Sequence, residues 1–396
     1  MGLKNRKILI VGLVKTSLIE SLEIFLASRV LCLGVIGVMS PFAPKNDSHC
    51  LLYEHGVLKK TWGLPAYLIQ RVTWWNYPLM LISYFVYIYS YLYSVILIRQ
   101  KFEVYIGVSM FSALFGLLLK KLGVVRFVIY YCLDYYPEPK SFGFHAGVNY
   151  VFRKIEPFLV KHVDVVWELS SKITAARKKY LQCVPDKKVD VPVGYSEQIM
   201  RCLQMEDRAR YDIAFIGSLS ENQGLQLAVE SMKELQKTFP QLKVHVIGHG
   251  TYAETIRKIV TDHDVNNSFI FHGFLSEEKK AYEILSHCAM AIAPYMGGAS
   301  DNAVFTEPGK PKLFLILGLP VLITDQTQIS IEIEKHHAGI RIKYSKHQFI
   351  DGVTKILKSD KCLQTYYDGV KKMQKTCTSE VIYTKAFEET FQLLNT

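Results

Sequence analysis

The C-terminal half of the chain alternates short apolar runs, rich in β-branched residues, with segments whose apolar residues recur at helical spacing. Neighbouring parallel strands need a long crossover connection, which is usually a helix. This alternation therefore predicts βαβ units, a parallel sheet and helices on both of its faces. We expect six strands, at residues 211–217, 242–248, 268–273, 289–295, 320–324 and 338–343, and six helices, at residues 224–237, 252–261, 276–287, 310–317, 330–335 and 348–357.

The N-terminal half alternates less regularly, but it predicts a second Rossmann-like domain. Its candidate strands are at residues 7–13, 30–38, 104–108, 127–132 and 163–167. A chain of 396 residues is too long for one ordinary core and fits two domains. We place an N-terminal domain at residues 1–200, a C-terminal domain at 201–375, and a final helix at 376–396 that packs back on the first domain. Residues 189–199 and the charged segment that follows them indicate the crossing between the domains, and we place the boundary near residues 200–210.

The first third of the chain is both basic and apolar. Residues 1–130 hold fourteen Lys and Arg against five Asp and Glu. Base-stacking and groove-reading motifs are missing, so this charge does not indicate a nucleic-acid partner. Basic residues that flank apolar aromatic stretches suit an anionic membrane surface instead. The flanking residues are Arg71, Arg99, Lys101, Lys120 and Lys121.

Residues 72–98 contain no charged residue and many tyrosines. Residues 79–98 are long enough to span a bilayer. A single crossing, however, would leave strands of one sheet on opposite sides of the membrane. We therefore favour a helix that lies in the membrane interface, where tyrosine is stable. A buried crossover helix of a large sheet is the competing interpretation.

The eight cysteines are scattered, without a C-x-x-C pair or a histidine at metal-ligand spacing. They indicate reduced thiols, and we expect no metal site. The N-terminal apolar run before Lys15 is too short for a secretion signal, and no cleavage site follows it. We expect a cytoplasmic protein that binds peripherally to the inner face of the membrane.

The loops that follow the predicted strands are the candidate binding site, because ligands of open parallel sheets bind outside the carboxyl ends of the strands. Gly217 and Gly248 each end a strand, and glycine lets backbone amides approach a phosphate. Tyr295 ends a third strand and could contact a base or a sugar. Lys310 and Lys312 begin a helix against its dipole, a conflict that a bound diphosphate would relieve. Tight turns and solvated lysines are the alternative interpretations.

Four segments carry a resemblance to a known family: GSLSENQGL, VIGHG, FHGFLSEEKKAYEILSHCAMAIAPY and EPGKPKLFLILGLPVLIT. In this order and spacing they resemble the donor-binding domain of group 1 (family 4-like) glycosyltransferases. The resemblance covers roughly residues 211–357. In the N-terminal half it rests on QKFEVYIGVS, LDYYP, VDVVWELSSKI and VPVGY, which follow the order of the family.

The resemblance implies a GT-B type α/β fold, in which two Rossmann-like domains present parallel sheets across an interdomain cleft. It further implies retaining transfer of a hexose from a UDP- or GDP-linked donor, without a metal or other cofactor, to an acceptor held by the N-terminal domain. Lys310 matches a lysine found in one branch of the family, and Lys312 adds charge. The donor-binding residues implied are Gly217, Ser218, Gln223, Gly248, Tyr295, Lys310 and Lys312.

The chain departs from the family pattern on the donor side. Ser218 and Gln223 stand where the family usually has Arg and Lys, so two phosphate contacts are neutral. The paired glutamates of the E-x7-E motif fall at Phe305 and Leu313. Glu307 is the nearest carboxylate, and we expect it to take the role of the first glutamate.

The acceptor side also departs from the pattern. GLVKTSL replaces the double-glycine loop, and Leu133 replaces the expected histidine. Asp134 is the candidate acceptor-side base or positioning residue, with His145 as a less certain neighbour; a turn residue is the alternative for Asp134.

These observations favour a membrane-associated hexosyltransferase of polysaccharide biosynthesis, acting on a lipid-linked or cell-surface glycan acceptor. The second hypothesis is a catalytically inactive scaffold or binding subunit, which the missing basic and acidic residues favour. A nucleotide-sugar epimerase of similar layout is a third, but it gives no reason for the apolar first domain.

Overall fold

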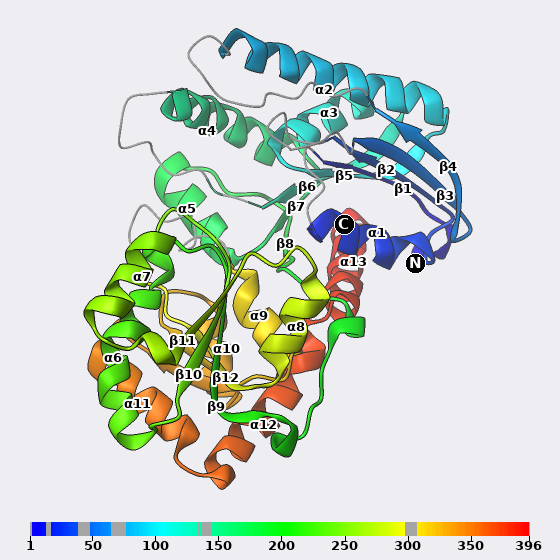
Figure 1. Cartoon of the computed structure of the whole chain (residues 1–396). Helices are drawn as coiled ribbons and strands as arrows, with labels where there is room; N and C mark the ends of the chain where they lie inside the picture. The colour runs from blue at the N-terminus through cyan, green and yellow to red at the C-terminus, as the bar shows by residue number, and fades with distance from the viewer. Residues whose placement is uncertain are drawn as a thin grey trace. The chain divides into compact units, whose positions relative to one another are not determined.

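The computed structural model describes residues 2–12, 17–38, 48–64, 77–133, 135, 144–297 and 307–395 (Figure 1). The chain divides into two compact units. The first contains Met1–Pro192 and Tyr383–Thr396, and the second contains Val193–Ile382. The chain thus leaves the first unit after Pro192 and returns to it within helix α13 (Ser379–Asn395).

The second unit is built on a six-stranded sheet in the order β11-β10-β9-β12-β13-β14. All its strand pairs are parallel, and all six predicted strands and all six predicted helices are confirmed to within about two residues. The strands are β9 (Ala209–Ile216), β10 (Lys243–Ile247), β11 (Phe269–Gly273), β12 (Cys288–Ala293), β13 (Val321–Thr324) and β14 (Gly339–Ile342). The helices are α6 (Leu225–Thr238), α7 (Ala253–Asp262), α8 (Glu278–Ser286), α9 (Gly309–Ile316), α10 (Ile329–Lys335), α11 (Lys346–Leu357) and α12 (Asp360–Gln374).

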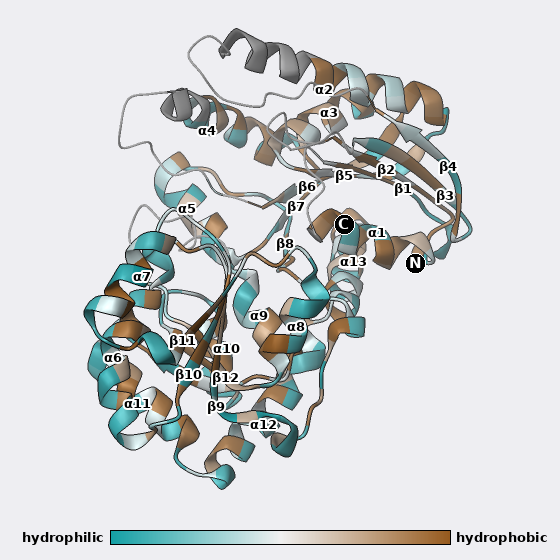
Figure 2. Ribbon diagram, viewed as in Figure 1, coloured by the Kyte–Doolittle hydropathy of each residue, from teal (hydrophilic) through white to brown (hydrophobic). Residues whose placement is uncertain are grey.

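Both faces of this sheet are buried under helices, so its strands are apolar along their length rather than alternating. Along β9, Ile213 and Phe215 pack with α6, α7 and α11, whereas Ala214 packs on the opposite face with α8 and α9. The strands are accordingly mostly brown in Figure 2, and the covering helices are apolar on one side and polar on the other.

The first unit is built on an eight-stranded sheet in the order β4-β3-β2-β1-β5-β6-β7-β8. The five predicted strands of this unit are confirmed. The strands are β1 (Lys7–Gly12), β2 (Cys32–Gly37), β3 (His49–Glu54), β4 (Val57–Gly63), β5 (Phe102–Val108), β6 (Val125–Cys132), β7 (Val165–Glu168) and β8 (Lys188–Asp190). The helices are α1 (Ser17–Ala27), α2 (Tyr77–Ile98), α3 (Met110–Lys121), α4 (Phe144–His162) and α5 (Ser171–Leu181).

The β3–β4 hairpin is absent from the sequence-based interpretation and makes one edge of this sheet antiparallel. Its two-residue loop is His55 and Gly56, with φ of 50° and 81°. Positive φ at both loop residues matches the twist of a hairpin, and glycine adopts it without strain. The segment His-Gly between two apolar runs was the available signal.

Helix α2 covers one face of the first sheet, where Tyr91 and Ile98 are buried against β2 and β3. Within the described residues, no helix combines the length and apolarity needed to cross a bilayer. The choice between an interfacial and a buried helix depends on the exposure of its side chains.

The last residues of the chain complete the core of the first unit. The indole of Trp167 on β7 donates a hydrogen bond to the Thr390 hydroxyl at 2.8 Å, and its ring meets Phe387 edge-on. Phe387 also stacks on Phe25 of α1, and the Arg6 guanidinium lies 3.8 Å from the centre of the Phe391 ring. Helix α13 therefore packs beside α1 in this unit (Figure 1).

Candidate functional site

The order of the second sheet places its topological switch point between β9 and β12. The chain moves outward from β9 to β10 and β11, then returns to β12 on the other side of β9. Loops from the carboxyl ends of β9 and β12 therefore diverge there and leave room for a ligand. Two contacts join them: the Met296 amide donates to the Asn222 carbonyl at 3.0 Å, and Gly224 lies against the Pro294 carbonyl.

The loops after β9 and β10 pack on each other through glycines. Gly217 and Gly248 have φ of 144° and 142°, which side chains rarely allow. A β-carbon on Gly248 would lie 1.8 Å from the Gly217 carbonyl oxygen, and one on Gly224 would lie 1.7 Å from the Pro294 carbonyl oxygen. Because these positions are glycine, the loops after β9, β10 and β12 pack with their backbones in direct contact.

Lys310 lies against this glycine loop. It stands in the first turn of α9, and its Nζ donates to the Gln223 Oε1 on the loop after β9. A β-carbon on Gly217 would lie 1.9 Å from that nitrogen, and the Phe215 and Tyr295 ring centres lie 5.6 and 6.0 Å away. Burial lowers the pKa of the Lys310 ammonium to about 8. Among the described residues no carboxylate pairs with it, so an anion bound there would stabilise its charged form.

Lys312 has a different environment. A separation of two residues places it about 200° around the helix from Lys310. Its ammonium is buried and forms an ion pair with Glu307 at 3.3 Å. The same ammonium lowers the pKa of the nearby Cys377 thiol, which burial raises to about 11. The structure therefore brings Lys310 to the glycine loop and keeps Lys312 and Glu307 together as a separate pair.

The remaining predicted donor residues differ in how far they are exposed. Tyr295 is 3% exposed, and its carbonyl accepts a hydrogen bond from the Thr324 hydroxyl at 2.8 Å. Its ring thus forms part of the floor under Lys310 rather than an exposed lip. Ser218 is exposed beside Gly217, and Gln223 is half-buried in contact with Lys310.

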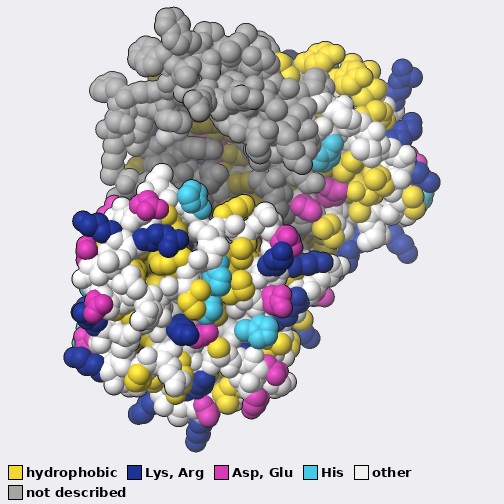
Figure 3. All heavy atoms as spheres, viewed as in Figure 1, with side chains coloured by type: hydrophobic (Ala, Val, Ile, Leu, Met, Phe, Trp, Pro, Cys, Tyr) yellow, Lys and Arg dark blue, Asp and Glu magenta, His cyan; other side chains and the backbone are white. Residues whose placement is uncertain are grey.

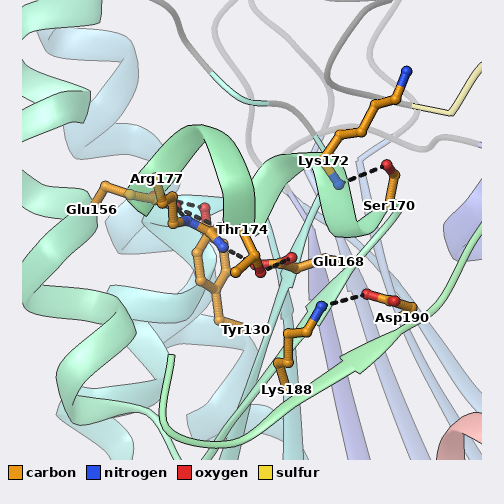
Figure 4. A network of polar contacts seen from close by, with 9 residues as sticks. All are labelled: Tyr130, Glu156, Glu168, Ser170, Lys172, Thr174, Arg177, Lys188 and Asp190. Atoms are coloured by element: carbon orange, nitrogen blue, oxygen red, sulfur yellow. Dashed lines mark hydrogen bonds and ion pairs between the residues drawn. The ribbon is translucent and has the colours of Figure 1, made fainter. Parts of the chain in front are cut away.

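On the first unit, strands β6, β7 and β8 end side by side, and a buried polar network supports these ends (Figure 4). The Arg177 guanidinium on α5 is fully buried and pairs with Glu168 at the end of β7 and with Glu156 on α4, the latter at 2.7 Å. The Tyr130 and Thr174 hydroxyls donate to Glu156 and Glu168 at 3.0 and 2.5 Å. Beside this network, Lys188 and Asp190 of β8 form an ion pair at 3.1 Å.

Asp134, the predicted acceptor-side residue, lies outside the described residues, as does the segment that follows Tyr135. His145 lies in the first turn of α4. Their acceptor-side role therefore stays a prediction.

Comparison with protein families decides the class of the second unit. Residues 204–373, almost all of this unit, match the model of the family described as glycosyl transferases group 1. The second unit is a group 1 glycosyltransferase domain. No curated protein matches the sequence.

Solved structures resemble the whole chain, including the part that precedes the glycosyltransferase domain. Sucrose-phosphate synthase from Thermosynechococcus elongatus aligns with a TM-score of 0.71 at 12% identity, over 98% of this chain and 100% of that one. HepE from Anabaena, in complex with UDP, aligns with a TM-score of 0.66 at 11% identity, over 96% and 98%. WaaG, a glycosyltransferase involved in lipopolysaccharide biosynthesis, aligns with a TM-score of 0.55 at 14% identity, over 77% and 81%. The chain has the GT-B fold of these proteins.

Two residues of the glycosyltransferase domain were missed at the site. Tyr344 follows β14, and its ring would lie 3.0 Å from a β-carbon on Gly224. Gln326 follows β13 and contacts Gly297 in the loop after β12. Both residues follow the carboxyl end of a strand, which is where ligands of open parallel sheets bind. The same rule selected the other loops, and it predicts these two residues when it is applied to the last two strands.

Proposed function

We propose that this protein transfers a hexose from a nucleotide diphosphate sugar to a lipid-linked or cell-surface glycan acceptor at the cytoplasmic face of a membrane. The observation that carries the proposal is the buried Lys310 ammonium at a glycine loop, at the switch point of a group 1 glycosyltransferase domain. The membrane-face action, the acceptor, retention of the donor's anomeric configuration and independence from metals are parts of this proposal.

The proposed chemistry begins with the diphosphate. It binds over Gly217 beside Lys310, and Lys310 stabilises the negative charge that grows on the leaving group as the glycosidic bond breaks. Glu307 and Asp134 are proposed for the sugar and acceptor sides. The ion pair with Lys312 at 3.3 Å orients the Glu307 carboxylate.

The names of similar structures support the donor class. Anabaena HepE was solved with UDP and with UDP-glucose, and the pneumococcal O-GlcNAc transferase GtfA with UDP and GlcNAc. WaaG, whose name places it in lipopolysaccharide biosynthesis, supports a lipid-linked acceptor. We therefore favour a UDP-linked donor over a GDP-linked one.

The donor site is tested by thermal unfolding of the protein with UDP, GDP and ADP in turn. A ligand at a hundred times its dissociation constant should stabilise the fold by about 2.7 kcal/mol. We expect a shift with UDP that is lost in Lys310→Ala. The matched control is Lys312→Ala, whose ammonium already pairs with Glu307, and it should retain most of the shift while losing some stability. A protein that no nucleotide stabilises would contradict the proposal and favour the inactive scaffold.

The affinity for UDP should fall as the pH rises above about 8, the pKa to which burial lowers Lys310. A bound diphosphate favours the protonated amine, so the pKa of Lys310 is higher in the complex than in the free protein. Below the lower of these two values the proton is bound in both states and the affinity is flat. Between them binding takes up a proton, and the affinity falls by up to about tenfold per pH unit.

Isothermal titration from about pH 7.5 to 9.5, above the phosphate pKa of about 6, measures this fall. Lys310→Arg stays charged throughout and should show little dependence on pH. An equal fall in the arginine variant would assign the effect to another group.

The inactive scaffold remains the second candidate, and the position of Leu313 favours it. Leu313 occupies the place of the second motif glutamate and is buried in the apolar core of the glycosyltransferase domain. Retained UDP binding without turnover of UDP-sugars on any glycan acceptor would select this alternative.

A further inference from the structure

Helix α2 is apolar on both of its sides. Toward the protein it buries Tyr91 and Ile98 together with Ser90 and Ser94, and the Ser94 hydroxyl donates to the Ser90 carbonyl at 2.6 Å. Toward solvent it exposes a stripe of large apolar and aromatic side chains. A helix on the surface of a water-soluble protein usually exposes polar side chains instead, because apolar groups are stabilised by leaving water. The exposed residues are Ile88, Tyr89, Leu92, Tyr93 and Ile96, with exposures from 38% to 63%.

Helix α3 extends this apolar surface. The Phe115 ring packs on Tyr91 of α2, with centres 5.2 Å apart. Leu118 and Leu122 follow Phe115 by three and seven residues, so they continue the same stripe of α3. Both are exposed, at 43% and 62%. We call these two leucines and the five α2 residues the outer patch; Figure 3 shows apolar side chains gathered over the C-terminal half of α2.

Basic residues predominate around the outer patch, and the nearby carboxylates of Asp164 and Glu54 are bound to Lys120 and Gln100. Helices α2 and α3 contain no acidic residue. Both helices lead directly into parallel strands, so their C-terminal ends lie at the same edge of the sheet. Four basic residues are exposed at this edge, and Figure 3 shows dark-blue side chains beside the apolar ones. These residues are Arg99, Lys101, Lys121 and Arg126.

We propose that the outer patch docks on an anionic lipid bilayer, with α2 lying in the plane of the interface. Isoleucine and leucine enter the acyl boundary, tyrosine is most stable at the level of the headgroups, and the basic edge meets lipid phosphates. A second copy of the chain would bring the two basic edges toward each other, which electrostatic repulsion disfavours. The biological role of this docking rests on the proposed function, but the docking itself is independent of the donor site.

The chain offers a matched pair of variants. Ile96 in the outer patch is 63% exposed, and Ile24 on α1 is 61% exposed. Helix α1 packs with α13 on the other face of the first sheet from α2 (Figure 1). Ile96→Glu and Ile24→Glu therefore make the same chemical change at the same exposure on opposite faces, and neither disturbs a buried contact.

The test is flotation of the full chain with vesicles of phosphatidylcholine and phosphatidylglycerol at low ionic strength. The protein should float with the vesicles, and it should float less at high salt and with phosphatidylcholine alone. Ile96→Glu should lower the vesicle affinity by about tenfold, because one large apolar side chain is lost and a like charge is added. Ile24→Glu should bind as the unaltered protein does.

Three results would overturn the proposal: no flotation of the unaltered protein, equal loss in the two variants, or a dimer in solution that Ile96→Glu dissociates. The last result would assign the outer patch to a second copy of the chain. Failure of vesicle binding with an intact UDP shift would reject the docking and leave the donor site, whereas loss of the UDP shift alone would reject the transferase and leave the docking.

Discussion

Replacement of Arg177 by methionine should lower the free energy of unfolding of the first unit by about 3–5 kcal/mol. The guanidinium is fully buried between the carboxylates of Glu156 and Glu168, and Glu168 is itself fully buried. Removal of the cation leaves two negative charges of the same sign in a medium that solvates neither. The loss should be smaller at pH 5 than at pH 8, because burial raises the pKa of Glu168 and its protonation removes one of the two buried charges.

Urea unfolding followed by tryptophan fluorescence measures this loss in one unit, since all four tryptophans, Trp62, Trp74, Trp75 and Trp167, belong to the first unit. The control is Lys188→Met, which breaks the neighbouring but more exposed pair with Asp190 and should cost less than about 1 kcal/mol. Similar losses in the two variants would mean that the buried network is not what holds α4 and α5 to the strands.

Gly248→Ala should abolish UDP binding and destabilise the second unit by several times the cost of Gly273→Ala. The added β-carbon would lie 1.8 Å from the Gly217 carbonyl oxygen, so the backbone of the Gly217 loop must move. The φ of 142° adds strain, because side chains rarely allow this conformation. Displacement of the Gly217 loop by an ångström also moves it relative to Lys310, so the proposed diphosphate site loses its geometry.

Gly273 is the matched control because it also ends a strand of the same sheet with positive φ, 70°, yet no atom lies within 4 Å of its β-carbon. Gly273→Ala should cost about 1 kcal/mol and leave UDP affinity near that of the unaltered protein. Circular dichroism melts and UDP titrations of both variants make the comparison. Equal UDP affinity in both would show that the Gly217–Gly248 contact does not shape the site.

The second unit was predictable because its signals are local. Each strand is a short apolar run that ends in Gly, Pro or a polar turn, and each helix has one buried stripe, so the period alone separates them. The first unit was harder, because the β3–β4 hairpin has mixed polarity and one exposed strand, and its register depends on antiparallel pairing with β2, which its own pattern does not show. Strand β8 has only three residues and was read as part of the linker.

The candidate site was predictable only as far as loop position determines it. The carboxyl-end rule selected Gly217, Gly248 and Lys310, which the structure brings together. It could not predict that Lys310 reaches the glycine loop while Lys312 does not. That difference depends on which side of α9 faces the loop and on the buried partner of Lys312, Glu307. The buried position of Tyr295 likewise follows from packing around it, which no local pattern contains.

The return of α13 to the first unit has a consequence for the order in which the protein forms. The hydrogen bond from Trp167 to Thr390 joins residues 223 positions apart, and closing so long a loop is slow because its entropy must be lost before the contact is gained. The second unit is one continuous stretch and has all its residues once Ile382 has emerged during synthesis. The first unit, although its first residues are made earlier, lacks part of its core until the final turns of α13 emerge, so its exposed apolar surface must be protected from aggregation until then.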